Sequence, residues 1–155
     1  MSRPTQQQLA VWRAFLEYSL AVLDVIDEEL QADAGLSVRW YDVLVHLEDA
    51  EDGLRMNELA LRILTSKSGL TRVIDNMEAA ALIRRERPDS DRRAVLVFIT
   101  PKGRDVASAA RASHHRSIDE HFASLLDPAD FKALAVAMAK LGDHARPLRP
   151  GRISG

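Results

Sequence analysis

A run of small polar and cationic side chains stands at the start of one predicted helix. Apolar residues recur at helical spacing at Leu70, Val73, Ile74 and Met77, which predicts a helix from Thr65 or Ser66 to about Ala80. The side chains facing away from that stripe are Ser66, Lys67, Ser68, Thr71 and Arg72. A helix that reads base edges and phosphates in a DNA groove needs short hydroxyls and long cationic donors of this kind. A solvated helix face would have the same composition, so both interpretations stay open at this point.

A second group of cationic residues follows in a predicted hairpin. Two short strands, 82–87 and 94–99, flank a turn that contains Arg92 and Arg93. Guanidinium groups near a hairpin tip suit a narrow minor groove, whose negative potential attracts them. Alternatively, Asp89 and Asp91 pair with these arginines in a charged surface loop. Both can hold, because an aspartate can brace one arginine while the other projects.

The charge of the chain is unevenly distributed. The net charge is −2, which alone argues against a nucleic-acid partner. Residues 54–104, however, hold 11 Lys and Arg against 6 Asp and Glu, whereas residues 1–53 hold 3 Arg against 11 acidic residues. The segment with the predicted helix and hairpin is therefore a basic region of an acidic protein, as phosphate contact requires.

The remaining elements are predicted to be helices. A long apolar stripe predicts a helix over 6–32 that ends at Gly35, and Ser37 can cap a second helix to about residue 50. Leu54 and Arg55 form a short strand, and Asn57 caps a helix over 58–64. Thr100 with Pro101 starts a helix over 101–125, and Asp127 caps a last helix over 128–144. The fold class is mainly α with a small β-hairpin wing (α+β), in one domain, 1–155, ending in a mobile basic tail, 145–155.

Two lobes are expected in this domain. Residues 36–100 form a winged helix-turn-helix lobe for DNA binding, and the terminal helices, 6–32 and 101–144, form the second lobe. The first helix carries more apolar stripe than a small domain can bury, so it is expected to cross a partner subunit.

Several other function classes are disfavoured. The chain has no cysteine, hence no disulfide or thiolate metal site, and no apolar run approaches the roughly 20 residues of a membrane span. The N-terminus has no apolar signal core, so a cytoplasmic location is expected. Because no phosphate-binding loop and no activated nucleophile is evident, we expect neither an enzyme nor a cofactor.

The ordered motifs resemble the MarR family of bacterial winged-helix regulators. The resemblance is carried by GLS at 35–37, MNELA at 56–60, SKSGLTRVIDNME at 66–78, LIRR at 82–85, DRRA at 91–94 and ITPKGR at 99–104. It implies a homodimer held by the terminal helices that binds a pseudo-palindromic operator in double-stranded DNA, usually as a repressor. The recognition positions fall on Ser66, Lys67, Ser68, Thr71 and Arg72, the wing arginine on Arg92 or Arg93, and the wing-steadying acid on Asp91.

One position departs from the family pattern. A glycine often ends the recognition helix in this family, and Ala81 stands there in this chain. A left-handed alanine would be strained, so we expect that turn to be built differently.

The resemblance also implies a switch. Many family members release DNA when a small aromatic or phenolic anion binds between the lobes. Candidate walls of such a pocket are Trp12, Leu16, Trp40, Tyr41 and Leu44, although core or dimer-interface roles would explain the same residues. A zinc-responsive regulator is a weaker alternative, because His114 and His121, with Glu120 nearby, lack the close spacing of a metal pair. A winged-helix module for protein interaction is a further alternative, which the basic region disfavours.

Overall fold

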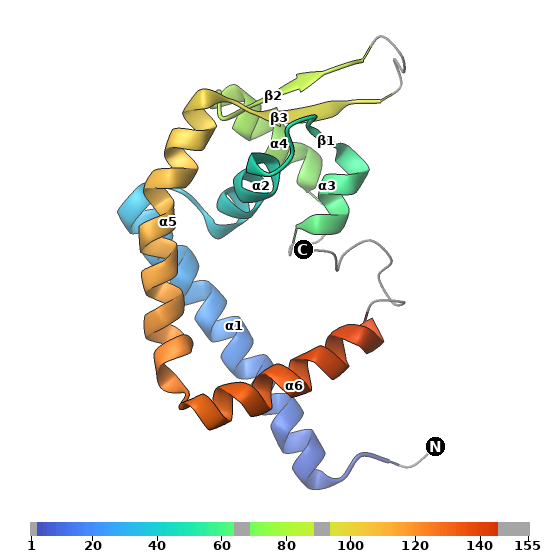
Figure 1. Ribbon diagram of the computed structural model, residues 1–155, viewed down its shortest axis with the longest axis vertical. Coiled ribbons are helices and arrows are strands. Elements are labelled where there is room, and N and C mark those ends of the chain that lie inside the picture. Colours follow the sequence, from blue (N-terminus) through green and yellow to red (C-terminus); the bar gives the residue numbers. More distant parts are fainter. Residues whose placement is uncertain (1–2, 64–68, 89–93, 146–155) are drawn as a thin grey trace.

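The computed structural model describes residues 3–63, 69–88 and 94–145. Figure 1 shows two parts, with a small sheet and short helices at one end and long helices leading to a crossing helix at the other. The chain runs in the order α1 (Gln6–Ala34), α2 (Val38–Glu48), β1 (Leu54–Arg55), α3 (Met56–Arg62), α4 (Leu70–Ala79), β2 (Ile83–Glu86), β3 (Leu96–Ile99), α5 (Pro101–His121), a 3-10 turn (Ala123–Leu125) and α6 (Pro128–Ala145). The predicted class, mainly α with a β-hairpin wing, is confirmed.

Helix α1 has well-defined ends. At its start, Gln8 N–H donates to Thr5 Oγ1 at 3.2 Å and Thr5 N–H donates to Gln8 Oε1 at 2.8 Å, which forms a capping box. At its end, Gly35 has φ of 63°, and its N–H donates to the carbonyl of Gln31. The helix is therefore two residues longer than the predicted 6–32. Although α1 is 29 residues long, only Ile26 and Leu30 are buried in it.

The core lies between α2, α3, α4 and the sheet. Ser37 caps α2, as predicted, by accepting the N–H of Trp40 at 3.3 Å. The most deeply buried side chains include Leu30, Leu44, Leu47, Leu59, Ile63, Ile74, Met77, Ile83 and Val97. Because α2, α4 and both wing strands contribute to this one cluster, the position of α4 is fixed by packing on several sides.

The sheet is antiparallel, with strand order β1–β3–β2. Leu54 pairs with Val97, and Ile83 pairs with Ile99. Helix α5 follows β3 directly; Thr100 caps it by accepting the N–H of Gly103 at 3.0 Å. A Cβ at Gly103 would lie 2.1 Å from the carbonyl oxygen of Leu82, so only glycine allows α5 to start this close to the wing.

Other predicted helix ends also differ from the structure. Helix α3 starts at Met56, not after Asn57, because Glu58 accepts the N–H of Arg55 at 2.8 Å and so begins the helix earlier. Helix α4 starts at Leu70 instead of Thr65 or Ser66, because Gly69 has φ of 82° and cannot be a helical residue. Helix α5 ends at His121, not at 125, since Phe122 leaves the helical region.

Helix α6 starts where the sequence predicts. Its cap is Asp127, whose Oδ1 accepts the N–H groups of Ala129 and Asp130, each at 2.8 Å. None of the helices in the described part of the chain is long and apolar enough to cross a bilayer.

Candidate DNA-binding surface and effector cavity

Helix α4 buries one face and exposes the other. Leu70, Val73, Ile74 and Met77 are buried, whereas Thr71 and Arg72 are exposed. The structure therefore places these two predicted DNA-contact residues on the free face of the helix. Asn76 is also exposed on α4, one turn beyond Arg72, and was not among the predicted DNA contacts. The other predicted contacts of this helix, Ser66, Lys67 and Ser68, lie outside the described residues.

An arginine of the wing holds α4 in place. The guanidinium of Arg85, in β2, forms ion pairs with Asp75 and with Glu78, the latter with Nε 3.1 Å from Oε2. The backbone N–H of Arg85 also donates to Glu78 Oε1 at 3.1 Å. The sequence did not reveal this role, because Arg85 is in a different element from Asp75 and Glu78. Only the fold brings β2 beside α4.

The wing begins as an ordered antiparallel pair of strands. At its base the guanidinium of Arg84 lies over the ring of Phe98, 4.4 Å from the centroid, in a cation–π contact. The predicted wing contacts Arg92 and Arg93 and the predicted brace Asp91 lie outside the described residues.

The turn between α4 and β2 contains a left-handed alanine. Ala81 has φ of 59°, so the expectation that the turn is built differently was wrong. The N–H of Leu82 donates to the carbonyl of Met77 at 3.0 Å, which is the closing bond of a helix that ends in a left-handed residue. Thr100 Oγ1 donates to the Ala81 carbonyl at 2.8 Å, and Lys102 Nζ donates to that of Ala80 at 2.8 Å. These bonds hold a conformation that alanine alone disfavours.

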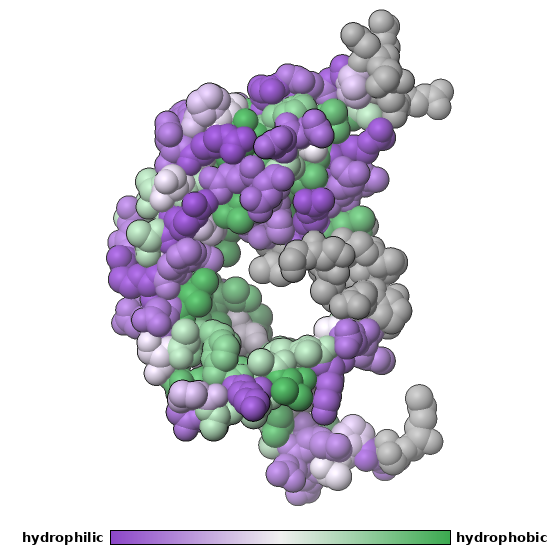
Figure 2. All heavy atoms as spheres, viewed as in Figure 1, coloured by the Kyte–Doolittle hydropathy of each residue, from purple (hydrophilic) through white to green (hydrophobic). Residues whose placement is uncertain are grey.

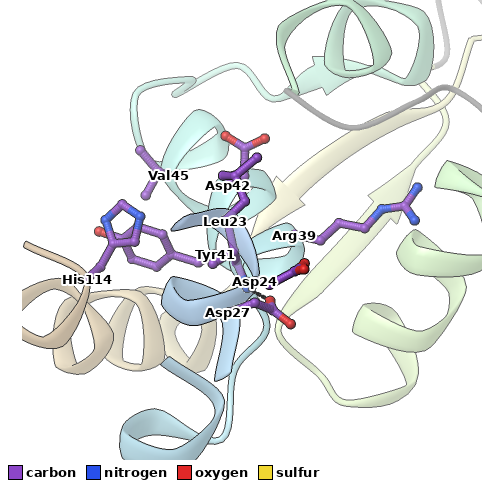
Figure 3. A pocket seen from close by; sticks show the side chains of 9 residues that line it. Leu23, Asp24, Asp27, Arg39, Tyr41, Asp42, Val45 and His114 are labelled. Carbon is purple, nitrogen blue, oxygen red and sulfur yellow. Dashed lines mark hydrogen bonds between the residues drawn. The ribbon is translucent and has the colours of Figure 1, made fainter. Parts of the chain in front are cut away.

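A cavity of about 410 Å³ lies where α1, α2 and α5 meet (Figure 3). It is lined mainly by apolar surface, with several ionisable groups, and its residues are Leu23, Asp24, Asp27, Val38, Arg39, Tyr41, Asp42, Val45 and His114. Of the five wall residues predicted from the sequence, only Tyr41 lines this cavity. Leu44 is fully buried in the core and Trp40 packs against the core, whereas Trp12 and Leu16 are exposed on the first half of α1.

Several polar groups of the cavity contact neighbouring residues. Asp27 Oδ1 accepts the N–H of Val38 at 2.7 Å, which ties α1 to the start of α2. Asp42 Oδ1 lies 3.5 Å from Nε2 of His46. The ring of His114 lies 4.5 Å from the ring of Tyr41. Burial lowers the pKa of His114, and the neighbouring His115 lowers it further, which favours the neutral imidazole.

A polar seam joins α1 to α5 beyond the cavity. Ser117 Oγ donates to Glu29, and Glu29 Oε1 lies 2.8 Å from Nε2 of His121. One turn along, Ser113 Oγ donates to Asp33 at 2.6 Å, and Arg116 pairs with the same carboxylate. His121 thus pairs with Glu29. Within the described ranges no group of three His, Asp or Glu residues is placed to hold a metal ion.

The other end of the molecule has a large exposed apolar surface. Figure 2 shows hydrophobic side chains gathered around the hollow beside α1 and α6. Helix α6 has no buried residue. The exposed large hydrophobic residues are Leu9, Val11, Trp12, Phe15, Leu16, Tyr18, Leu20, Leu23, Val25, Leu125, Phe131, Val136, Met138 and Leu141. A surface of this extent on a small protein marks an interaction site.

Comparisons with known proteins agree with this architecture. A sequence model of the MarR family matches residues 34–94. The transcriptional repressor MprA of Escherichia coli (strain K12) is 23% identical over 120 residues, which are 77% of this chain and 68% of MprA.

Two crystal structures are similar along nearly the whole chain. AbsC, a MarR family transcriptional regulator from Streptomyces coelicolor, is 33% identical, with 95% of this chain and 99% of that chain covered and a TM-score of 0.84. Sco3205, a MarR family regulator from the same organism crystallised in complex with DNA, is 29% identical, with 97% and 92% covered and a TM-score of 0.86. The chain therefore belongs to the MarR family of DNA-binding transcriptional regulators.

Proposed function

We propose that this regulator binds a pseudo-palindromic operator as a homodimer, represses transcription in the cytoplasm, and releases DNA when a small molecule occupies the cavity between α1, α2 and α5. The observation that carries the DNA-binding part is the geometry of α4. Its apolar face is buried, Thr71 and Arg72 are exposed, and Arg85 ties the helix to the wing. A helix held in this way can enter a major groove without losing its position.

The homodimer is supported by the apolar surface on α1 and α6. Helix α6 is 18 residues long and has no buried residue, so a single subunit gives it little stabilisation. Many of the large exposed hydrophobic residues lie between Leu9 and Leu20, on the half of α1 farthest from the winged lobe (Figure 1). A second copy would cover both surfaces, and its two-fold axis would set two α4 helices roughly 34 Å apart on one DNA face. The division into a DNA-binding lobe, 36–100, and a dimerisation lobe belongs to this proposal.

The DNA contacts are assigned by position. Thr71 and Arg72 would reach base edges, and Ser66, Lys67 and Ser68 are proposed as further DNA contacts. Arg92 and Arg93 would contact the adjacent minor groove or its phosphates, with Asp91 bracing them. Because lysine and arginine release counterions from DNA, binding should weaken steeply as salt rises.

The cavity is suited to control α4. Arg39, which lines the cavity on α2, extends to the turn before the recognition helix: its Nη2 lies 3.6 Å from the position that a Cβ of Gly69 would occupy. Gly69 directly precedes α4. A ligand that shifts α2 or Arg39 would thus shift the start of α4, and differential affinity for the two arrangements would couple ligand and DNA binding.

The test uses the full chain and DNA from upstream of its own gene. We expect light scattering to give a dimer, and fluorescence anisotropy to show two subunits per site with affinity that falls steeply with salt. A monomer at micromolar concentration, or binding that is insensitive to salt, would contradict the proposal.

A further inference from the structure

The cavity between α1, α2 and α5 has the charge of a cation site. We propose that it takes a hydrophobic cation, an ammonium group on an aromatic or branched aliphatic body, in place of the aromatic anion that the family resemblance implies. This inference rests on the proposed function, in which the same cavity holds the effector. The site is defined by the cavity and its aromatic wall together, and the carboxylates decide only which charge it accepts.

Three carboxylates line the cavity from two helices. Asp24 and Asp27 are three residues apart on α1 and so share a helix face, and Asp42 lines the cavity from α2, with its carboxylate pointing away from the other two in Figure 3. Asp27 is partly engaged by the N–H of Val38, and Asp42 lies near His46. Asp24 is exposed and makes no hydrogen bond or ion pair within the part of the chain that the structure describes. Its two oxygens are therefore available to a bound ammonium group.

The lining contains two basic residues, Arg39 and His114. Figure 3 shows Arg39 extending away from the other labelled side chains. Its guanidinium ends beside Gly69, with Nη2 and Nη1 at 3.6 and 3.8 Å from the position of a Cβ there. His114 is the other basic group, and burial favours its neutral form. Among the described lining residues, negative charge prevails where a ligand would lie.

The rest of the lining suits an apolar body. Leu23, Val38 and Val45 supply aliphatic surface from α1 and α2, and Tyr41 supplies an aromatic ring against which His114 packs. Aromatic faces attract ammonium groups, because the ring quadrupole is negative above the ring. The volume of about 410 Å³ falls within the usual range for sites that hold small organic molecules. An anionic ligand of the same size would instead lose its hydration beside carboxylates of like charge.

Three probes with one apolar body and different charge test this inference. They are 3-phenylpropylammonium, 3-phenylpropan-1-ol and 3-phenylpropanoate, titrated by calorimetry into the DNA-free dimer at pH 7 and constant salt. We expect the ammonium to bind at least about tenfold more tightly than the alcohol, and the carboxylate to bind more weakly than the alcohol. Tighter binding of the carboxylate, equal binding of ammonium and alcohol, or no binding of any probe at about 10 mM would overturn the inference.

Two matched variants test whether Asp24 is responsible for the preference for the ammonium probe. Asp24→Asn should reduce ammonium binding about tenfold and leave alcohol binding unchanged. Glu28→Gln, with the same charge change on the same helix but no place in the cavity lining, should change neither. If the two variants behave alike, general electrostatics explains the preference and the inference is wrong.

A separate arm distinguishes failure of the inference from failure of the proposed function. The ammonium probe is added to the protein–DNA complex and followed by anisotropy. Binding without release of DNA would leave the ligand class standing and refute the effector role of the cavity. Absence of any DNA binding would refute the proposed function while the calorimetry still decides the ligand class.

Discussion

Arg85 in β2 forms an ion pair with Asp75 in α4, so the base of the wing and the recognition helix are one connected unit. Glu78, one turn further along α4, joins the same arginine. The side chain of Arg85 is 27% exposed and that of Asp75 is 54% exposed, so solvent screens this pair in part and its contribution to stability is modest. A role in holding α4 predicts behaviour that differs from that of a DNA-contacting arginine.

Replacing Arg85 should weaken DNA binding without changing its salt dependence. We expect Arg85→Ala to lower affinity for the operator and to reduce the free energy of unfolding by about 1 kcal/mol, because α4 loses two partners on the wing. Asp75→Asn should have a similar, smaller effect. Anisotropy at several salt concentrations measures this. If the slope of log affinity against log salt falls by about one unit, Arg85 contacts a phosphate and the positioning role is wrong.

Replacement of alanine by glycine should change the free energy of unfolding differently at Ala81 and at Ala79. Ala81→Gly should leave the free energy of unfolding unchanged or raise it by up to about 1 kcal/mol, because relief of the strain at φ of 59° outweighs the added flexibility of the unfolded chain. Ala79→Gly, the same change two residues earlier in an exposed helical position, should lower it by about 1 kcal/mol. Urea denaturation of both variants measures the difference. Equal losses of stability would show that Ala81 is not strained.

The polar seam between α1 and α5 predicts a pH-dependent effect. The hydrogen bond from Ser117 lowers the pKa of Glu29 from its ordinary value of 4.5, with His121 as the next contribution. A carboxylate with a lowered pKa stabilises the fold above its unfolded pKa, and this contribution is lost as pH falls through the folded value. Ser117→Ala should therefore destabilise the protein at pH 7, and its difference from the wild type should shrink below about pH 4. Thermal unfolding at pH 7 and pH 3 measures this, and a difference that does not change with pH would contradict it.

The exposed apolar surface predicts how the dimer can be broken. Leu20→Asp combined with Leu141→Asp places charge at two of the most exposed large apolar positions, on α1 and α6. We expect a monomer in light scattering and a loss of operator affinity, because two linked half-sites bind far more tightly than one. Lys132→Asp, an exposed change on α6 outside the apolar set, serves as the control. A double variant that stays a dimer would place the interface elsewhere.

Local rules predicted most of the fold. Gly35, Ser37, Thr100 and Asp127 each mark a helix end by their own backbone or side-chain chemistry, and the structure uses all four. Apolar spacing also identified the buried face of α4. The start of α4 was predicted wrongly, because an amphipathic pattern continues through Gly69 although its backbone is left-handed.

The candidate sites were harder to predict from the sequence than the fold. The residues that line the cavity depend on which face of α1 meets α2 and α5. The rotation of α1 about its axis is set by contacts between different elements, such as those of Asp27 with Val38 and of Ser117 with Glu29. The same is true of Arg85, whose partners are known only once β2 lies beside α4. Among the predicted wall residues Tyr41 lines the cavity, whereas its neighbour Trp40 packs against the core.

The most direct test of DNA recognition by α4 compares two variants on two DNA duplexes. Thr71→Ala with Arg72→Ala should reduce affinity for the operator, each change costing about 1–3 kcal/mol if it removes a base contact, and should reduce affinity for a scrambled duplex much less. Glu28→Gln, on α1, should bind both duplexes as the wild type does. Anisotropy titrations at one salt concentration give the ratio of the two affinities. We expect the ratio of operator affinity to scrambled-duplex affinity to fall towards one in the α4 variant, whereas an unchanged ratio would show that α4 does not read the operator.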